Sequence, residues 1–215
     1  MHSNTTALVS SVVQSLRDQG MRGLILDLRF NRGGLLTTSI ELADVFIEDA
    51  LIATVREPRT GIESKRTGVK EGSQTGFPMV CLVNDSTASG AEIVAACLQD
   101  QNRAVLIGER TYGKGSVQNV DAFDGGEIQI TTSLVFRGTG KNLEKETTGG
   151  NDEEDWGVVP DKVLNLTDRE RGDLDEHLRD LEIMPRRDGP TKPKKPAFQD
   201  RQLEMALEHL RTTLR

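Results

Sequence analysis

The sequence has no apolar run that approaches the ~20 residues of a membrane-spanning helix. Its first residues, Met-His-Ser-Asn-Thr-Thr, contain no charged segment followed by an apolar one, so we expect no export signal in them. Basic residues are not in excess either: 34 acidic residues outnumber 27 basic ones, and the net charge is −7. Because nucleic acid and anionic membranes bind basic surfaces, we expect neither as the main partner.

Cysteine and histidine are scarce. Cys81 and Cys97 lie in apolar segments, which favours buried free thiols over a disulfide. The three histidines, His2, His177 and His209, are scattered along the chain, and no spacing typical of metal ligands is present. The residues therefore predict no metal site.

A length of 215 residues is enough for one good hydrophobic core. The segment 79–107 predicts a strand (79–83), a helix (91–98) and a second strand (104–107), a unit that favours a parallel sheet with a right-handed crossover. The fold class is therefore α/β. The other elements that we expect up to residue 136 are a helix at 5–19 closed by Gly20, a strand at 24–28, a helix at about 36–47, a strand at 51–55, a polar loop or ribbon at 56–77, and paired strands at 116–120 and 127–136.

The last third of the chain has a different character. It predicts an acidic loop (145–155), a turn (156–161), a charged helix (168–181), and a basic, proline-rich linker within 185–198. A helix at 199–214 follows, with Leu203, Ala206, Leu207 and Leu210 on one face. Such a face most often packs on its own domain, and self-association into a homo-oligomer through it is the alternative. We expect a core (1–184), the linker (185–198) and a C-terminal helical appendage (199–215).

The most informative stretch runs from Asn84 to Gln118. It places Ser89 at the mouth of a predicted helix and Lys114 in a glycine-rich loop after a strand. A serine hydroxyl is a poor nucleophile until a base removes its proton, and no histidine is near in the sequence. A lysine that burial keeps neutral can take that role, and Ser–Lys pairs are a known variant of the catalytic triad.

Each residue also has a simpler interpretation. Ser89 can be an ordinary helix N-cap, and Lys114 a solvated lysine in a glycine turn. The catalytic hypothesis gains weight because a helix start also provides free N–H groups that can stabilise an oxyanion. Gly33 and Gly34 lie at a second strand-to-helix junction and offer another such donor.

A nucleotide-binding loop is the competing interpretation of Gly108 to Lys114, whose spacing matches the start of a phosphate-binding loop. However, Gly115 stands where serine or threonine should hold magnesium. The residues that follow it predict a strand, whereas phosphate binding of this kind needs a helix N-terminus. We therefore consider nucleotide binding the weaker hypothesis.

Four motifs in this order resemble the C-terminal processing (tail-specific) peptidases. They are Gly-Leu-Ile-Leu-Asp-Leu-Arg (23–29), Asn-Arg-Gly-Gly (31–34), Ser-Thr-Ala-Ser-Gly-Ala-Glu (86–92) and Gly-Glu-Arg-Thr-Tyr-Gly-Lys-Gly-Ser-Val-Gln (108–118). The match extends from about Gly20 to Asp161. The resemblance implies a ClpP/crotonase-like core of mixed sheet and helices, no metal or cofactor, and protein or peptide substrates engaged near their C-termini.

The resemblance also implies a role for individual residues. Ser89 corresponds to the nucleophile, Lys114 to its base, and Gln118 to a residue that positions the lysine. The backbone N–H groups of Gly34 and Gly90 correspond to the oxyanion donors. Positions 114 and 118 would be ~13 Å apart on a straight strand, so we expect a bend near Gly115.

The chain departs from the family in several places. Arg32 replaces the usual proline, and Ser89-Gly-Ala-Glu92 replaces the usual Ser-Ala-Ser-Glu. The family's export signal, PDZ domain and first core strands have no counterpart in these residues, although the cell envelope is its usual location. A serine endopeptidase with a Ser89/Lys114 dyad is the first hypothesis, and a non-catalytic remnant that acts as an interaction module is the alternative.

Overall fold

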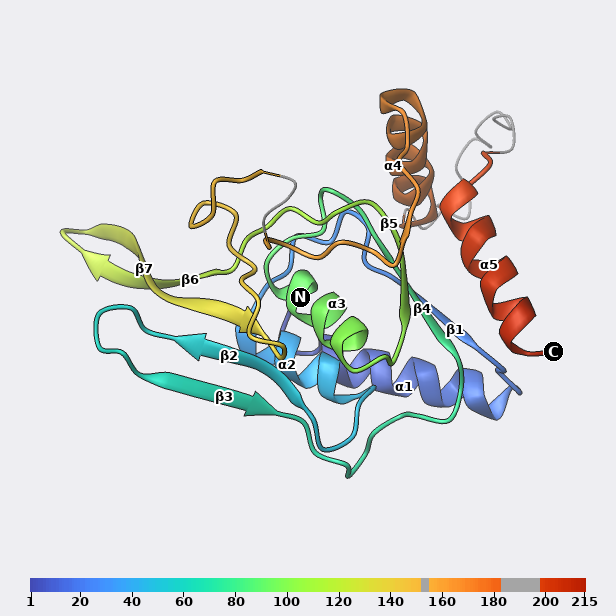
Figure 1. Ribbon diagram of the computed structural model, residues 1–215, viewed down its shortest axis with the longest axis horizontal. Helices are drawn as coiled ribbons and strands as arrows, with labels where there is room; N and C mark the ends of the chain where they lie inside the picture. Colours follow the sequence, from blue (N-terminus) through green and yellow to red (C-terminus); the bar gives the residue numbers. More distant parts are fainter. Residues whose placement is uncertain (152–154, 183–197) are drawn as a thin grey trace.

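The computed structural model describes residues 1–151, 155–182 and 198–215, which contain two four-stranded sheets (Figure 1). The first sheet is parallel, with the strand order β1 (Leu24–Asp27), β4 (Met79–Val83), β5 (Val105–Gly108) and β8 (Lys162–Val163). The second is antiparallel, with the order β3 (Glu63–Thr67), β2 (Leu51–Arg56), β7 (Gly126–Arg137) and β6 (Ser116–Phe123). The predicted α/β class is therefore confirmed as a mixed fold.

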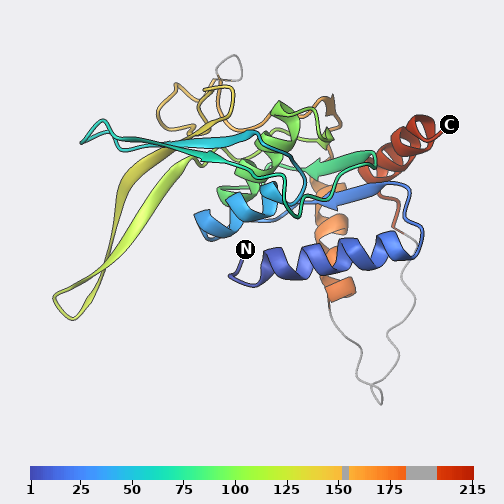
Figure 2. The ribbon, with the colours of Figure 1, turned by 90° about the horizontal axis from the view of Figure 1, so that it is seen from below.

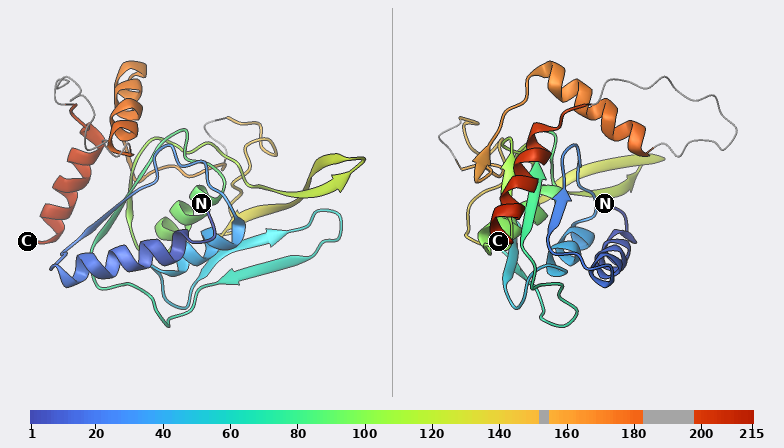
Figure 3. Two further views of the ribbon diagram at one scale, coloured as in Figure 1. Left: turned by 180° about the vertical axis from the view of Figure 1, so that it is seen from behind. Right: turned by 90° about the vertical axis from the view of Figure 1, so that its right-hand side faces the viewer.

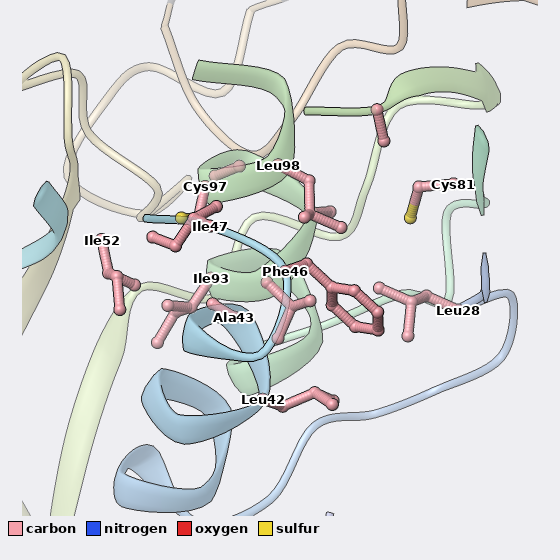
Figure 4. Packing of buried hydrophobic residues seen from close by; sticks show 14 of the residues in the cluster. Leu28, Leu42, Ala43, Phe46, Ile47, Ile52, Cys81, Ile93, Cys97 and Leu98 are labelled. Atoms are coloured by element: carbon pink, nitrogen blue, oxygen red, sulfur yellow. The ribbon is translucent and has the colours of Figure 1, made fainter. Parts of the chain in front are cut away.

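Five helices of the described residues surround these sheets: α1 (Thr5–Asp18), α2 (Leu36–Asp44), α3 (Gly90–Asp100), α4 (Asp168–Glu182) and α5 (Arg201–Thr213). Helix α3 lies in the middle of the molecule, between the two sheets (Figure 1). Its first nine residues are all buried, because it contacts α2, β2, β4, β5 and β7. Figure 4 shows Ile93 and Leu98 of α3 in the same core as Ala43 and Phe46.

The parallel sheet is covered on both faces, and the side chains of its central strand β4 are buried on each of them. Its five residues, Met-Val-Cys-Leu-Val, are all buried. Cys81 and Val83 belong to the core that contains α2 and α3, whereas Val80 and Leu82 pack against α5 on the opposite face (Figures 2 and 3). A continuous apolar run is what a central parallel strand needs for such a double cover.

Several sequence-based expectations need correction. Helix α2 ends at Asp44 rather than near residue 47, whereas the ribbon expected as one alternative for 56–77 is present as β3, which pairs with β2. Leu8 and Val12 of α1 are more than half exposed, because only Val13 of this helix turns fully into the core. The β6–β7 hairpin is longer than expected and projects from the body of the molecule (Figure 2).

Other expectations have a clearer outcome. Cys81 and Cys97 are buried free thiols, as predicted. On α5, Ala206 and Leu210 are buried against the parallel sheet, whereas Leu203 and Leu207 stay partly exposed, so self-association through this helix stays a prediction. The linker expected at 185–198 lies outside the described residues apart from residue 198, and the proposed division of the chain stays a prediction. None of the described helices has the length and apolarity to cross a bilayer.

A buried ionic cluster joins α5 to the end of β1. The side chain of Arg29 is 1% exposed and forms ion pairs with Asp27 at 2.6 Å and with Asp200 at 2.7 Å. It also donates a hydrogen bond to Gln202 Oε1 at 3.1 Å. Because Arg29 directly precedes the loop 30–35, the C-terminal helix holds the strand end from which that loop begins.

We expect Arg29→Met to lower the free energy of unfolding by roughly 3–5 kcal/mol, because it leaves two carboxylates without their buried cation. Arg201→Met, which removes a half-exposed partner of Glu170, is the control and should leave the urea midpoint nearly unchanged. Equal midpoints for the two variants would contradict this account.

Acid should weaken the same cluster. Burial would raise the pKa of Asp200, but its hydrogen bonds with Arg29 and with backbone N–H groups outweigh burial and lower the pKa. A carboxyl whose pKa is lower in the folded state than in the unfolded chain stabilises the fold. This stabilisation is fully present at a pH above the pKa in the unfolded chain, about 4, and it is lost as the pH falls through the pKa in the folded state.

Candidate active site

Ser89 lies in a strained turn between β4 and α3. Its φ of +56° and ψ of −121° are unusual for a residue with a side chain and place it directly before the first residue of α3. Two contacts fix this turn to the loop after β1: Thr87 Oγ1 donates to Leu28 O at 2.8 Å, and Ala88 N donates to Asn31 O at 3.0 Å. The ends of β1 and β4, which the sequence predicted as parts of the site, are therefore neighbours.

A buried carboxylate, Glu92, connects the serine turn to the lysine loop. One oxygen accepts from Ser89 N and Lys114 N, each at 2.8 Å, and the other accepts from Thr111 Oγ1 at 2.5 Å and Gly113 N at 2.7 Å. Burial raises the pKa of Glu92, and all four hydrogen bonds act in the opposite direction. The backbone positions of Ser89 and Lys114 are thus set by one side chain.

The lysine loop is packed closely on both sides of Lys114. A Cβ at Gly113 would lie 2.8 Å from the ring of Trp156, and one at Gly115 would lie 2.8 Å from the backbone nitrogen of Glu144. Gly113 also has a φ of +87°, which favours glycine. Lys114 itself is exposed, so the described residues do not shelter it from water as the predicted role of a base requires.

One pocket of about 290 Å³ brings together all five residues that the sequence predicted, namely Gly34, Ser89, Gly90, Lys114 and Gln118. Leu36, Ile93, Val117 and Val135 add apolar walls to it. Among the described residues, no hydrogen bond joins the Ser89 hydroxyl to the Lys114 amine. The pocket therefore contains both residues of the predicted dyad without a hydrogen bond between their described side chains.

Gln118 makes a different contact from the one expected with Lys114. Its amide donates to Thr131 Oγ1 of β7 at 3.2 Å, across the hairpin. The register of the β6–β7 pairing is irregular between Val117 and Gln118: β6 advances by one residue there, while β7 advances by two, from Ser133 to Thr131. The bend expected near Gly115 stays a prediction. Because the extra residue lies in β7, the irregularity determines which residue of β7 faces Gln118, and no local sequence pattern shows that pairing.

The candidate oxyanion donors are adjacent. A Cβ at Gly90 would lie 3.4 Å from Gly34 N, so the two backbone N–H groups belong to one small region beside Ser89. The same Cβ would lie 2.1 Å from Ser39 Oγ, which explains why glycine follows Ser89 in this chain. The backbone of Met1 also lies against Gly34, and its carbonyl accepts from Leu35 N at 3.3 Å.

We expect Gly33→Ala to damage both stability and activity. The new Cβ would lie 2.5 Å from Gly90 N and 2.6 Å from Ala88 O, inside the candidate site. Gly20→Ala is a matched control, because Gly20 has the same φ of +84° and nothing within 4 Å of the added carbon. The control should show only the backbone cost of about 1 kcal/mol, and Gly33→Ala at least about 2 kcal/mol more. Similar thermal shifts would exclude the close packing of Gly33.

Other chemistries find less support at this site. In the described part of the chain, no three His, Cys, Asp or Glu side chains gather as metal ligands would. Burial raises the pKa of Cys81 far above its usual range and that of Cys97 to about 12, so neither thiol is a reactive thiolate. The residues after Gly115 form β6 rather than a helix, so the segment 108–114 is not a phosphate-binding loop.

Sequence reasoning missed Glu92 and Thr111 as parts of the site. The spacing Ser-x-x-Glu at 89–92 was the available signal, because a glutamate three residues after a helix-capping serine reaches back to its backbone. In this structure the same carboxylate also reaches a loop more than twenty residues away. No local pattern reports that second contact.

Comparisons with known proteins agree with this geometry. A model of peptidase family S41 matches residues 1–164. A carboxyl-terminal-processing protease of Synechocystis sp. is 37% identical over 164 residues, which are 75% of this chain and 35% of that protein. The carboxy-terminal processing protease CtpA of Bacillus subtilis is 38% identical over 146 residues, 67% of this chain and 31% of that protein.

Among solved structures, the photosystem II D1 C-terminal processing protease superposes with a TM-score of 0.66 at 32% identity, over 76% of this chain and 40% of that one. The fold and the family match together define a serine-type peptidase core. The chain belongs to peptidase family S41. It spans about a third of the length of the curated relatives that it matches.

Proposed function

We propose that the protein is a serine endopeptidase with a ClpP/crotonase-like core, in which Ser89 is the nucleophile and Lys114 the general base. The observation that carries this proposal is the single pocket that contains both residues, each fixed through its backbone to the carboxylate of Glu92. The names of its relatives favour cleavage of protein substrates near their C-termini.

The reaction has two halves. The neutral Lys114 amine takes the proton of the Ser89 hydroxyl while the oxygen attacks the scissile carbonyl, and the N–H groups of Gly34 and Gly90 stabilise the resulting oxyanion. The Lys114 ammonium then protonates the leaving amine as the C–N bond breaks. Water attacks the acyl-enzyme, Lys114 takes the water's proton, and Ser89 is released with its proton restored.

The exposure of Lys114 fits this scheme if the substrate itself completes the site. A peptide bound in the pocket covers the amine and excludes water, which favours the neutral form that a base needs. Gln118 lies in the same pocket, and in this proposal its amide exchanges Thr131 for the lysine when the substrate is bound.

The substrate class is tested with an unstructured peptide that has a free C-terminus. We expect its incubation with the protein to give products whose cleavage sites, mapped by mass spectrometry, lie near that end. A compact folded domain that carries the same segment internally is the control and should stay intact. No cleavage of either would favour the non-catalytic interaction module, and equal cleavage of both would contradict the preference for unstructured chain ends.

A further inference from the structure

The strand that follows Lys114 lies at an open edge of its sheet. Within the described residues, the order β3-β2-β7-β6 gives strand β6 a single neighbour, β7, and the two strands project together beyond the body of the molecule (Figure 2). The start of β6 also lines the catalytic pocket, through Ser116, Val117 and Gln118. An edge strand presents backbone N–H and C=O groups that can pair with an added strand.

The direction of these groups follows from two hydrogen bonds. Gly115 O accepts from Val135 N of β7 at 2.8 Å, so Gly115 faces β7. Successive residues of a strand direct their backbone groups to opposite edges, and the N–H and C=O of Ser116 therefore point away from β7. Lys114 N points to that same side, because it donates a hydrogen bond to the side chain of Glu92 in the first turn of α3. The open edge thus faces the side of Ser89.

We propose that the free edge of β6 is the substrate-docking strand, to which an extended peptide adds by backbone pairing as it passes Ser89. This inference rests on the proposed function and specifies how the same site holds its substrate. The pocket is continuous with the edge, since Ser116 lines it together with Gly34 and Leu36. A peptide paired here runs between that wall and the start of α3 and covers Lys114.

This mode of binding defines the substrate class. Main-chain hydrogen bonds supply the affinity, so the peptide must be extended and unstructured, whatever its sequence. Selectivity is left to the side chain that enters the apolar part of the pocket, near Ile93, Val117 and Val135. We therefore expect tolerance of polar and charged residues at the other positions.

Proline substitution tests the edge directly. In a Ser89→Ala background that cannot turn over substrate, Ser116→Pro removes the outward N–H and places a ring on the open edge. The matched control is Glu63→Pro: Glu63 is the first residue of β3 on the opposite edge, and it points outward because Ile62 O accepts from Glu57 N at 2.9 Å. Proline is tolerated at such positions, where no ladder bond is lost.

The measurement is the dissociation constant of a fluorescent unstructured peptide, from anisotropy. We expect Ser116→Pro to weaken binding roughly tenfold and Glu63→Pro to leave it unchanged. Equal affinity of Ser116→Pro and its parent overturns the proposal. So does a Ser116→Pro variant that loses a dimer and keeps peptide binding, because the edge then pairs with a second copy of the chain.

A scan of the peptide keeps the test independent of whether Ser116→Pro folds. Single N-methyl groups are placed along the peptide, and binding to the Ser89→Ala protein is measured for each. We expect losses at every second position, because only alternate N–H groups of an added strand face β6. If N-methylation weakens binding at no position of the peptide, the docking inference is overturned. Alternating losses with no cleavage by the unsubstituted protein would support docking and reject the peptidase proposal alone.

Discussion

Lys114→Ala is expected to lower kcat/KM for an unstructured peptide by roughly 10⁴-fold, since it removes the group that accepts and returns the proton in the proposed mechanism. The change should leave the fold intact, because the side chain is exposed and only the backbone N–H of Lys114 bonds to Glu92. Peptide hydrolysis and a thermal melt of the same sample measure the two effects separately.

Two further lysine variants sharpen this test. Lys114→Arg keeps a positive charge in the pocket, but a guanidinium stays protonated and cannot act as a base, so we expect it to be as inactive as the alanine variant. Lys141→Ala removes an exposed lysine paired with Asp155 and should keep full activity. Activity retained by Lys114→Arg would assign the lysine an electrostatic role rather than that of a base.

Glu92→Gln is expected to have the second largest effect, on stability and activity together. Either orientation of the amide places an NH₂ group against two donors, for example Ser89 N and Lys114 N, where the carboxylate accepted both. Leaving buried donors unpaired costs about 1–3 kcal/mol each, so we expect the free energy of unfolding to fall by roughly 2–6 kcal/mol.

The activity readout separates positioning from simple destabilisation. Well below its melting temperature, Glu92→Gln should lose kcat by roughly 10²-fold, because the proposed nucleophile and base would no longer be held by the same side chain. Glu127→Gln, an exposed carboxylate on the hairpin, is the control and should match the unsubstituted protein. Full kcat at low temperature would show that Glu92 only stabilises the fold.

The sequence predicted the parts of the site that depend on local structure. A strand, a turn and a helix start specify where Ser89 lies, and an apolar strand followed by glycines specifies the loop of Lys114. Each of these patterns lies within a few neighbouring residues, so it can be recognised in the sequence without knowledge of the tertiary fold. The buried run 79–83 was predictable for the same reason.

Long-range contacts decided what the sequence could not predict. The position of Gln118 depends on an irregular register between β6 and β7, and the role of Glu92 depends on a loop that meets it only in the folded chain. The ion pair of Arg29 with Asp200 joins residues 171 positions apart.

The central claim is that the pocket activates one particular hydroxyl, and acylation by a fluorophosphonate probe tests it most directly. The protein and its Lys114→Ala variant are each treated with the probe, and the modified residue is identified by mass spectrometry. The account predicts one adduct, on Ser89, which the variant forms far more slowly. An adduct on another serine, none at all, or equal rates for the two proteins would contradict it.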